Sequence, residues 1–368
     1  MYQVLVVDDE PMAASLIVNI INRKYSDFEI MGTAYNGQEA LEIMEEKGEP
    51  DILITDIQMP VMNGLRLVEE TKKRYPDVVS VIVSGYQEFE YAKQAISFGV
   101  CDYILKPIVP SEFAHLIEKL EKKVKEKYYR ARNILMHRLV NEIPVKEESL
   151  HRYFSSDHYY GAIVRLNGLP SRYGERTGRE IFSDINELML AYGRDSQETL
   201  YLCPEELVCD GDFQQIMERR IGKEQPSAAY VTTIIQSRSV PVSQIGEMVR
   251  GLYRMLDSSI ILGKSQTLVM EDPGKESVGK VQDRDYEYLE ELEYFAQNQK
   301  YDRLQKDTED LIRKWTSQEK PQIWIEARLR QIAYLLQRYE AGNRDYREAE
   351  FLMDDIFSSA ENVDQLCC

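Results

Sequence analysis

The fold is decided by the stretch Ile52-Leu53-Ile54-Thr55-Asp56, a short apolar run that ends abruptly in an acid. Four similar runs occur elsewhere, and segments with helical spacing separate all five. These other runs are Val4–Val7, Phe28–Ala34, Val79–Val83 and Tyr103–Leu105. Short runs rich in Val and Ile are typical of strands buried on both faces, and their alternation with helices implies right-handed crossovers. Residues 1–120 are therefore predicted to form an α/β domain with a doubly wound, five-stranded parallel sheet.

Polar side chains follow four of the five predicted strands. Ligands of such sheets bind at the carboxyl ends of the strands. The residues at those ends are Asp8-Asp9-Glu10, Asp56, Ser84 and Lys106-Pro107. Each has an ordinary explanation alone, because Asp and Ser are common in loops and a single Lys is usually a solvated charge. Their coincidence at matching strand ends instead predicts one shared site.

Three carboxylates at one edge of a sheet repel one another, and a divalent cation makes that crowding tolerable. An oxygen-only ligand set without His or Cys favours Mg²⁺. A metal held by Asp8, Asp9 and Asp56 would also neutralise charge on an incoming phosphoryl group. One carboxylate would then be the nucleophile that forms an acyl phosphate. Lys106 and Ser84 would contact the phosphate oxygens.

This motif set resembles the receiver-domain signature of bacterial two-component response regulators, which have a flavodoxin-like fold. The matching segments are Asp8-Asp9, Asp56 through Gly64, Ser84-Gly85-Tyr86 and Lys106-Pro107. The resemblance implies a sensor histidine kinase as partner. It also implies that the chain is not an enzyme beyond its own phosphotransfer and dephosphorylation. A hydrolase with an aspartyl-phosphate intermediate is disfavoured, since it would need a general acid where this chain has Gln58.

The resemblance also assigns a metal role to four positions. It implies that Asp56 is the phosphoacceptor, becoming 4-aspartylphosphate, and that Asp9 and Asp56 bind Mg²⁺ directly. It implies that Asp8 acts mostly through water. The backbone carbonyl of Gln58 would be the third protein ligand.

Three further positions take switching or phosphate-binding roles from the same resemblance. It implies that Ser84 is the switch hydroxyl, that Lys106 binds the phosphate and that Tyr103 is the aromatic that turns inward on activation. The peptide bond before Pro107 is expected to be cis, as is usual in the family.

The stretch Ser84 through Ile96 resembles more narrowly the YesN/AraC-type regulators, whose output is transcription. Two helix-turn-helix motifs normally follow in that family, yet no such motif with a basic recognition helix occurs before Cys368. A net charge of -18 also argues against DNA binding by this chain. We expect DNA contact only through a region absent from this chain. The alternative is a regulator that ends at Cys368 and acts through protein–protein contacts.

A long helix is predicted from Glu112 to about Val140, within a linker of residues 112–143 that overlaps the end of the receiver. Its apolar side chains recur every three or four residues among many charges, which is a coiled-coil pattern. They are Leu116, Leu120, Val124, Tyr128, Ala131, Leu135 and Leu139. A homodimer seam is favoured over a single linker helix packed on its neighbours.

Residues 158–272 are predicted to form a ferredoxin-like α+β sandwich. The expected strands are Tyr159–Leu166, a hairpin over Thr199–Cys209, and Ala228–Ser237. The expected helices are Ile181–Tyr192, Phe213–Ile221 and Val242–Leu256, and Ile260–Lys264 is a strand or turn. The segment from Ser243 to Lys264 resembles the degenerate GGDEF-like domain of YesN-type regulators. It lacks the GGDEF motif itself, so no cyclase activity is expected.

Residues 283–368 show helical spacing throughout, and their aromatic side chains are interpreted as core. A chain of 368 residues predicts two or three domains. No apolar stretch reaches the length of a membrane span, and no secretion signal precedes the first strand. The five cysteines form no Cys-x-x-Cys pair and the four histidines no ligand pattern. We therefore expect a cytoplasmic protein with reduced thiols and no membrane contact.

Overall fold

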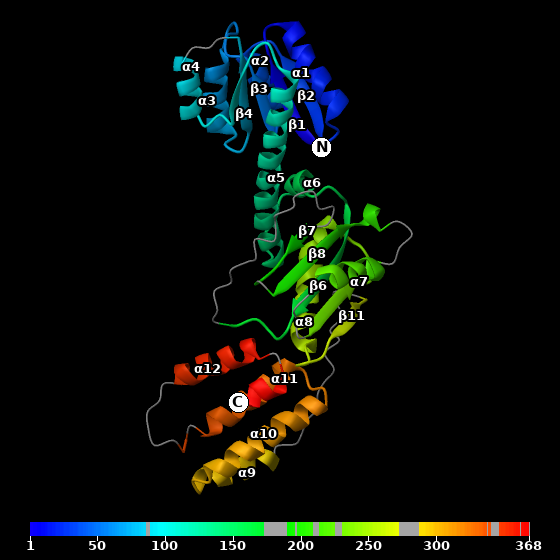
Figure 1. Ribbon diagram of the computed structural model, residues 1–368, viewed down its shortest axis with the longest axis vertical. Coiled ribbons are helices and arrows are strands. Elements are labelled where there is room, and N and C mark those ends of the chain that lie inside the picture. Colours follow the sequence, from blue (N-terminus) through cyan, green and yellow to red (C-terminus); the bar gives the residue numbers. More distant parts are fainter. Residues whose placement is uncertain are drawn as a thin grey trace. The chain divides into compact units, whose positions relative to one another are not determined.

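The computed structural model describes residues 1–85, 89–172, 190–195, 197–208, 213–224, 230–271, 287–336, 338–339, 346–360 and 362–367. Residues 86–88 of the YesN-like stretch, Cys209 and Cys368 lie outside these described residues. The chain divides into two compact units, unit 1 (Met1–Ala131) and unit 2 (Arg132–Cys368). Figure 1 shows a sheet flanked by helices in each unit.

Unit 1 is built on a five-stranded parallel sheet in the order β2-β1-β3-β4-β5. Its strands are β1 (Tyr2–Val7), β2 (Phe28–Ala34), β3 (Ile52–Thr55), β4 (Val79–Ser84) and β5 (Asp102–Leu105). Two of these strands have the bounds that the sequence predicts, and the other three differ by one or two residues at an end. The predicted doubly wound parallel sheet is confirmed.

Helices cover both faces of this sheet because successive strand side chains point to opposite sides. The helices are α1 (Pro11–Lys24), α2 (Gly37–Lys47), α3 (Gly64–Arg74), α4 (Phe89–Ser97) and α5 (Pro110–Val140). On β1, Val4 and Val6 pack with α1 and α5, whereas Leu5 and Val7 pack with α2 and α3. Asn36 and Asn63 cap α2 and α3, each accepting a hydrogen bond from a backbone N–H three residues later.

The apolar stripe of α5 is buried within the chain's own two cores. Leu116, Leu120 and Val124 are at most 2% exposed and belong to the core of unit 1. Leu135 belongs to the core of unit 2, and Leu139 packs against that core. These side chains pack within the chain's own two cores, as the linker interpretation expects. The homodimer stays a prediction.

Unit 2 contains a mixed sheet in the order β11-β9-β6-β8-β7, with a short strand β10 paired to β6. Its strands are β6 (His158–Leu166), β7 (Leu190–Tyr192), β8 (Glu198–Pro204), β9 (Val231–Gln236), β10 (Val240–Pro241) and β11 (Gln266–Met270). Within the order β9-β6-β8-β7, each pair of neighbouring strands is antiparallel. Numbered along the chain, their order is 4-1-3-2, that of a ferredoxin-like sandwich. Strand β11 extends the sheet in parallel with β9.

Both faces of this second sheet are covered. Its helices are α6 (Glu147–Tyr153), α7 (Phe213–Glu224) and α8 (Ile245–Ser259), with single 3-10 turns at Glu205–Leu207 and Val242–Gln244. Helix α7 packs on one face, where the ring of its Phe213 lies 5.1 Å from that of Tyr160 of β6. Helix α8 packs on the other, where its Met248 belongs to the same hydrophobic cluster as Ile163 of β6. The sheet is therefore the middle of three layers.

Two predicted elements of this region differ from the structure. Residues 181–189 of the predicted helix Ile181–Tyr192 lie outside the described residues, and its last three residues form strand β7. The predicted hairpin at Thr199–Cys209 is one strand, β8, followed by a 3-10 turn. The hairpin turn lies earlier, between β7 and β8. Residues Ile260–Lys264 form a turn, which is one of the two predicted alternatives, and the strand that follows is β11.

The remaining helices complete the core of unit 2. They are α9 (Glu287–Gln297), α10 (Tyr301–Ser317), α11 (Gln322–Leu336), α12 (Tyr346–Ser359) and α13 (Val363–Cys367). Trp315 of α10 and Ile325 of α11 belong to the same hydrophobic cluster as Met248 of α8. Trp315 packs edge-on against Trp324, which agrees with the interpretation of these aromatics as core. The predicted boundary between residues 158–272 and 283–368 stays a prediction. None of the described helices has the length and apolar character that a membrane crossing requires.

Candidate metal centre

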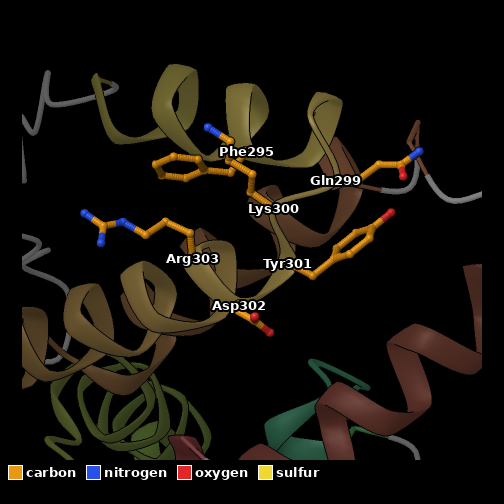
Figure 2. Close-up of a pocket in the computed structure, with 6 residues that line it drawn as sticks. All are labelled: Phe295, Gln299, Lys300, Tyr301, Asp302 and Arg303. Atoms are coloured by element: carbon orange, nitrogen blue, oxygen red, sulfur yellow. The ribbon is translucent and has the colours of Figure 1, made fainter.

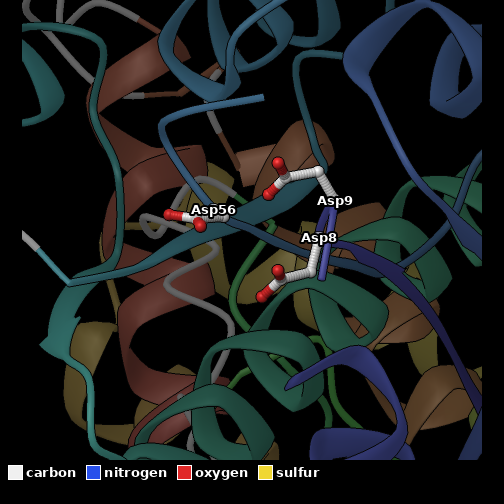
Figure 3. A group of neighbouring side chains, drawn as sticks. All are labelled: Asp8, Asp9 and Asp56. Atoms are coloured by element: carbon white, nitrogen blue, oxygen red, sulfur yellow. The ribbon is translucent and has the colours of Figure 1, made fainter. Parts of the chain in front are cut away.

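Three carboxylates meet where two neighbouring strands end. Asp8 and Asp9 follow β1, and Asp56 follows β3. The strands are paired so that Val7 lies beside Thr55, and the backbone N–H of Asp56 donates to the carbonyl of Val7 at 2.9 Å. One carboxylate oxygen from each acid lies within 4.8 Å of the other two (Figure 3). Parallel pairing thus brings together the three acids that the sequence places at strand ends.

Two of the three acids are withdrawn from water. Asp8 is 1% exposed and Asp56 is 8% exposed, whereas Asp9 is exposed. Each buried carboxylate accepts one backbone hydrogen bond, Asp8 from Glu10 at 3.0 Å and Asp56 from Ile57 at 2.6 Å. Burial raises the pKa of Asp8, and hydrogen bonds from Lys106 and from the backbone of Glu10 oppose that rise.

Lys106 lies between the two buried carboxylates. Its Nζ is 2.8 Å from Oδ2 of Asp8 and 2.9 Å from Oδ2 of Asp56. Burial of the ammonium group would lower the pKa of Lys106, but the hydrogen bonds and charges of the two acids outweigh burial and raise it. Lys106 is therefore a permanent cation that pairs both acids at once.

The site fits a magnesium ion. One ammonium group faces three carboxylates, so the cluster retains negative charge after the ion pairs are counted. The donors are hard oxygens, and no His or Cys belongs to the group found among the described residues. Mg²⁺ prefers such oxygens and tolerates partial hydration, which the exposed Asp9 side allows. Asp8, Asp9 and Asp56 are the residues that could hold it.

The other predicted site residues surround this cluster. Ser84 ends β4 and is fully buried, and its carbonyl accepts a hydrogen bond from the backbone N–H of Lys106 at 2.8 Å. Gln58 lies two residues beyond Asp56, in the loop before α3, with an exposed side chain. Tyr103 of β5 is partly buried and packs with the cluster that contains Ala95 of α4. The Lys106–Pro107 peptide bond is cis, as the resemblance implies.

Gly64 has a role at the site that sequence reasoning did not assign. It begins α3, and a Cβ there would overlap the carbonyl oxygen of Asp56. Its N–H donates to the carbonyl of Ile57 at 2.9 Å, which closes the loop that holds Asp56. The only signal in the sequence is the pair Asn63-Gly64, in which a capping residue precedes a residue without a side chain.

A second hollow lies at the turn between α9 and α10. It is an open cleft of about 460 Å³ lined by Phe295, Gln299, Lys300, Tyr301, Asp302 and Arg303 (Figure 2). Its charged groups are two cations and one carboxylate. It therefore lacks the converging carboxylates and the buried ammonium group that make the strand-end cluster suited to phosphoryl chemistry.

Comparison with known proteins identifies a family for the segment that carries this cluster. Residues 4–118 match the response regulator receiver domain. The chain is similar to the uncharacterized transcriptional regulatory protein YesN of Bacillus subtilis, with 28% identity over 253 residues, 67% of this chain and 64% of YesN. It is also similar to the chemotaxis protein CheY of Thermotoga maritima, with 34% identity over 120 residues, 33% of this chain and 98% of CheY.

A solved structure is similar over the same region. The receiver domain of AraT, a response regulator from Geobacillus stearothermophilus, shares 32% identity and covers 34% of this chain and 97% of its own, with a TM-score of 0.33. The chain spans 64% and 49% of the length of the first curated relatives that it matches. Through the receiver domain at its N-terminus, the chain belongs to the response regulator family.

Proposed function

We propose that this chain is the response regulator of a two-component phosphorelay and receives a phosphoryl group on Asp56 with Mg²⁺ present. The observation that carries the proposal is the cluster of Asp8, Asp9 and Asp56 with Lys106 placed between its two buried acids. Such a cluster is negative enough to need a cation, and it presents a buried carboxylate as nucleophile.

Asp56 is the group best placed to react. An oxygen of its carboxylate attacks the phosphorus of the donor, a new O–P bond forms, and the bond from phosphorus to the donor's leaving atom breaks with its electron pair. Ile57 N–H holds Oδ1 of Asp56 at 2.6 Å, which fixes the plane of the carboxylate. When bound, Mg²⁺ would supply positive charge against the transferred group. Asp8 and Asp9 would hold that ion together with Asp56 and the carbonyl of Gln58.

Ser84 ends β4, the strand beside β3, and Lys106 follows β5, the next strand of the sheet. Lys106 now pairs with Asp56, and after transfer its ammonium group would pair with the phosphoryl oxygens instead. The Ser84 hydroxyl would donate to the same oxygens. Strands β4 and β5 are paired, with Ser84 beside Leu105, so a shift of Ser84 would displace the strand that carries Tyr103. These three residues are the proposed switch.

A sensor histidine kinase is the proposed phosphodonor, since the receiver family implies a cognate kinase. The proposed output is control of transcription. Its support is the similarity to YesN, whose name describes a transcriptional regulatory protein. Unit 2 would then carry the signal from the receiver toward that output.

The test is phosphorylation by acetyl phosphate followed by intact-mass measurement. We expect the wild-type chain to gain the mass of one phosphoryl group and Asp56→Asn to gain none. Asp102→Asn is the matched control, because it makes the same change at the amino end of β5, where Asp102 pairs with Lys119 at 2.9 Å. Equal labelling of all three proteins, or no labelling of the wild type with any phosphodonor, would refute the proposal.

A further inference from the structure

A second group of buried charges lies at the opposite end of strand β3. The strand has four residues, Ile52–Thr55, all buried. Asp56 follows its carboxyl end and Asp51 precedes its amino end. Asp51 is 1% exposed. The two acids are therefore joined by one short, fully buried strand.

Asp51 is fixed to the strands on both sides of β3. Its N–H donates to the carbonyl of Gln3 at 2.8 Å, and its own carbonyl accepts from the N–H of Val79 at 3.0 Å. Its side-chain Oδ2 accepts a third bond, from the N–H of Gln3 at 3.0 Å. The position of the Asp51 carboxylate is thus set by the sheet.

The same carboxylate binds helix α5. The phenol of Tyr128 donates to Oδ2 of Asp51 at 3.0 Å, and Nζ of Lys127 lies 3.3 Å from Oδ1. Lys127 is itself 7% exposed and also pairs with Glu49 at 3.1 Å. The ring of Tyr128 packs edge-on against Tyr2. Buried charges of this kind are costly to leave unpaired, so each partner holds the other in place.

Lys127 and Tyr128 lie in the last turn of α5 before unit 1 ends at Ala131. The helix continues without a break to Val140. Its final turn is fixed within unit 2, where Arg250 of α8 donates to the carbonyls of Leu139 and Val140. A Cβ at Gly246 would overlap the Leu139 carbonyl, so the two helices touch backbone to backbone there. Each end of α5 therefore has its own tight attachment.

We propose that Asp51, Lys127 and Tyr128, the Asp51 cluster, fix α5 to the sheet of unit 1 and pass the state of Asp56 to that helix through β3. The fixing role stands on the contacts alone, whereas the passing role rests on the proposed phosphorylation of Asp56. The three are positioning residues, because none of them touches the reacting atoms. Because β3 is short and fully buried, we expect it to move as one piece. A displacement of Asp56 would then also displace Asp51.

The first experiment measures amide hydrogen exchange of residues 121–131 in the full, unphosphorylated chain. Asp51→Asn and Lys127→Met remove one charge each with little change of shape. We expect exchange in this segment to accelerate by roughly tenfold or more, because local opening becomes easier. Lys122→Met is the matched control, since Lys122 is exposed on the same stretch of α5. Where a charge variant fails to fold, Tyr128→Phe removes the hydrogen bond to Asp51 without removing a charge and should give a smaller acceleration.

The second experiment repeats the exchange after treatment with acetyl phosphate and Mg²⁺, with phosphorylation read by intact mass. We expect phosphorylation to alter exchange of residues 121–131 in the wild type and in Lys122→Met. The same stoichiometry of phosphorylation in Asp51→Asn should leave that segment unaltered.

Three results would overturn the inference. Unchanged exchange in the unphosphorylated Asp51 cluster variants would remove the fixing role. A phosphorylated wild type with no change in residues 121–131, or an Asp51→Asn protein that keeps the change, would remove the passing role. A wild type that accepts no phosphoryl group would instead defeat the proposed function and the passing role, and the first experiment would still decide the fixing role.

Discussion

In unit 1 the buried carboxylates Asp8 and Asp56 share the single ammonium group of Lys106, whereas in unit 2 the buried carboxylate Glu198 is bound by two guanidinium groups. Glu198 is fully buried, and its Oε2 lies 2.6 Å from Arg194 and 3.3 Å from Arg165. Both units thus bury charge, but with opposite ratios of anions to cations around the most buried groups.

Two partly exposed acids, Asp257 and Asp195, extend the unit 2 network. Arg194 also pairs with Asp257 of α8 at 2.8 Å and stacks over the ring of Tyr253 at 4.2 Å. Arg165 pairs with Asp195 at 3.1 Å. The network ties the β7–β8 turn to β6 and α8, and every one of its charges has a partner of opposite sign.

The difference separates a structural network from a functional one. In unit 2 every carboxylate of the network is paired with a guanidinium group, so an added cation would bring little. In unit 1 three carboxylates share one ammonium group, so the cluster is less stable by itself and gains stability when a cation binds. Single variants test this contrast. The largest loss of stability is expected at Glu198, the buried carboxylate that two guanidinium groups share.

Glu198→Ala should destabilise unit 2 strongly. The change leaves the buried guanidinium group of Arg165 and the partly buried one of Arg194 without their shared partner. Breaking a buried pair costs about 3–5 kcal/mol. Urea unfolding followed by the fluorescence of Trp315 and Trp324, both in unit 2, measures the loss. Asp56→Asn should lose far less, because it relieves crowding at the same time. Similar losses for the two variants would contradict the contrast.

A matched pair of glycines sharpens the comparison. A Cβ at Gly64 would overlap the carbonyl of Asp56, and a Cβ at Gly193 would overlap the carbonyl of Glu198. Alanine at either position should cost about 1–3 kcal/mol in its own unit, as overpacking usually does. Only Gly64→Ala should also slow labelling by acetyl phosphate, because it displaces Asp56. Slow labelling of Gly193→Ala would show that the rate of phosphorylation in unit 1 depends on the packing of unit 2.

The smallest effect is expected for Asp8→Asn, with a sign that depends on magnesium. Burial already raises the pKa of Asp8, so its charged form is disfavoured in the folded protein. Without Mg²⁺ the amide should therefore raise the free energy of unfolding by about 1 kcal/mol. Saturating Mg²⁺ should stabilise the wild type more than the variant. The difference in free energy of unfolding between the two proteins should therefore become smaller or change sign. Thermal unfolding with and without Mg²⁺ measures both, and an Asp8→Asn protein that is less stable without Mg²⁺ would count against an excess of negative charge.

The sheet of unit 1 could be predicted because neighbouring residues in the sequence determine where each of its strands begins and ends. A run such as Ile52–Thr55 has turn-forming or charged residues at both ends, so its bounds are set by a few neighbouring residues. Strand ends in a parallel sheet meet at one edge, which is why the sequence also brought Asp8, Asp9, Asp56 and Lys106 into one predicted site.

Features that depend on distant contacts were not predicted. The apolar stripe of α5 has the same spacing whether it packs on its own sheet or on a second chain, so the sequence could not distinguish the two. The pairing of Asp51 with Lys127 joins residues 76 positions apart and has no local signal. Strand β7 has three residues and gains its structure from pairing with β8, which explains why a helix was expected there.

Mapping of the acyl phosphate in the presence and absence of Mg²⁺ tests the central claim most directly. The full chain is treated with acetyl phosphate in buffer containing Mg²⁺ or a chelator, and the labelled peptide is identified by mass spectrometry after borohydride reduction. We expect label on Asp56 with Mg²⁺ and almost none with the chelator. Label on a different residue, or equal labelling of Asp56 under both conditions, would contradict it.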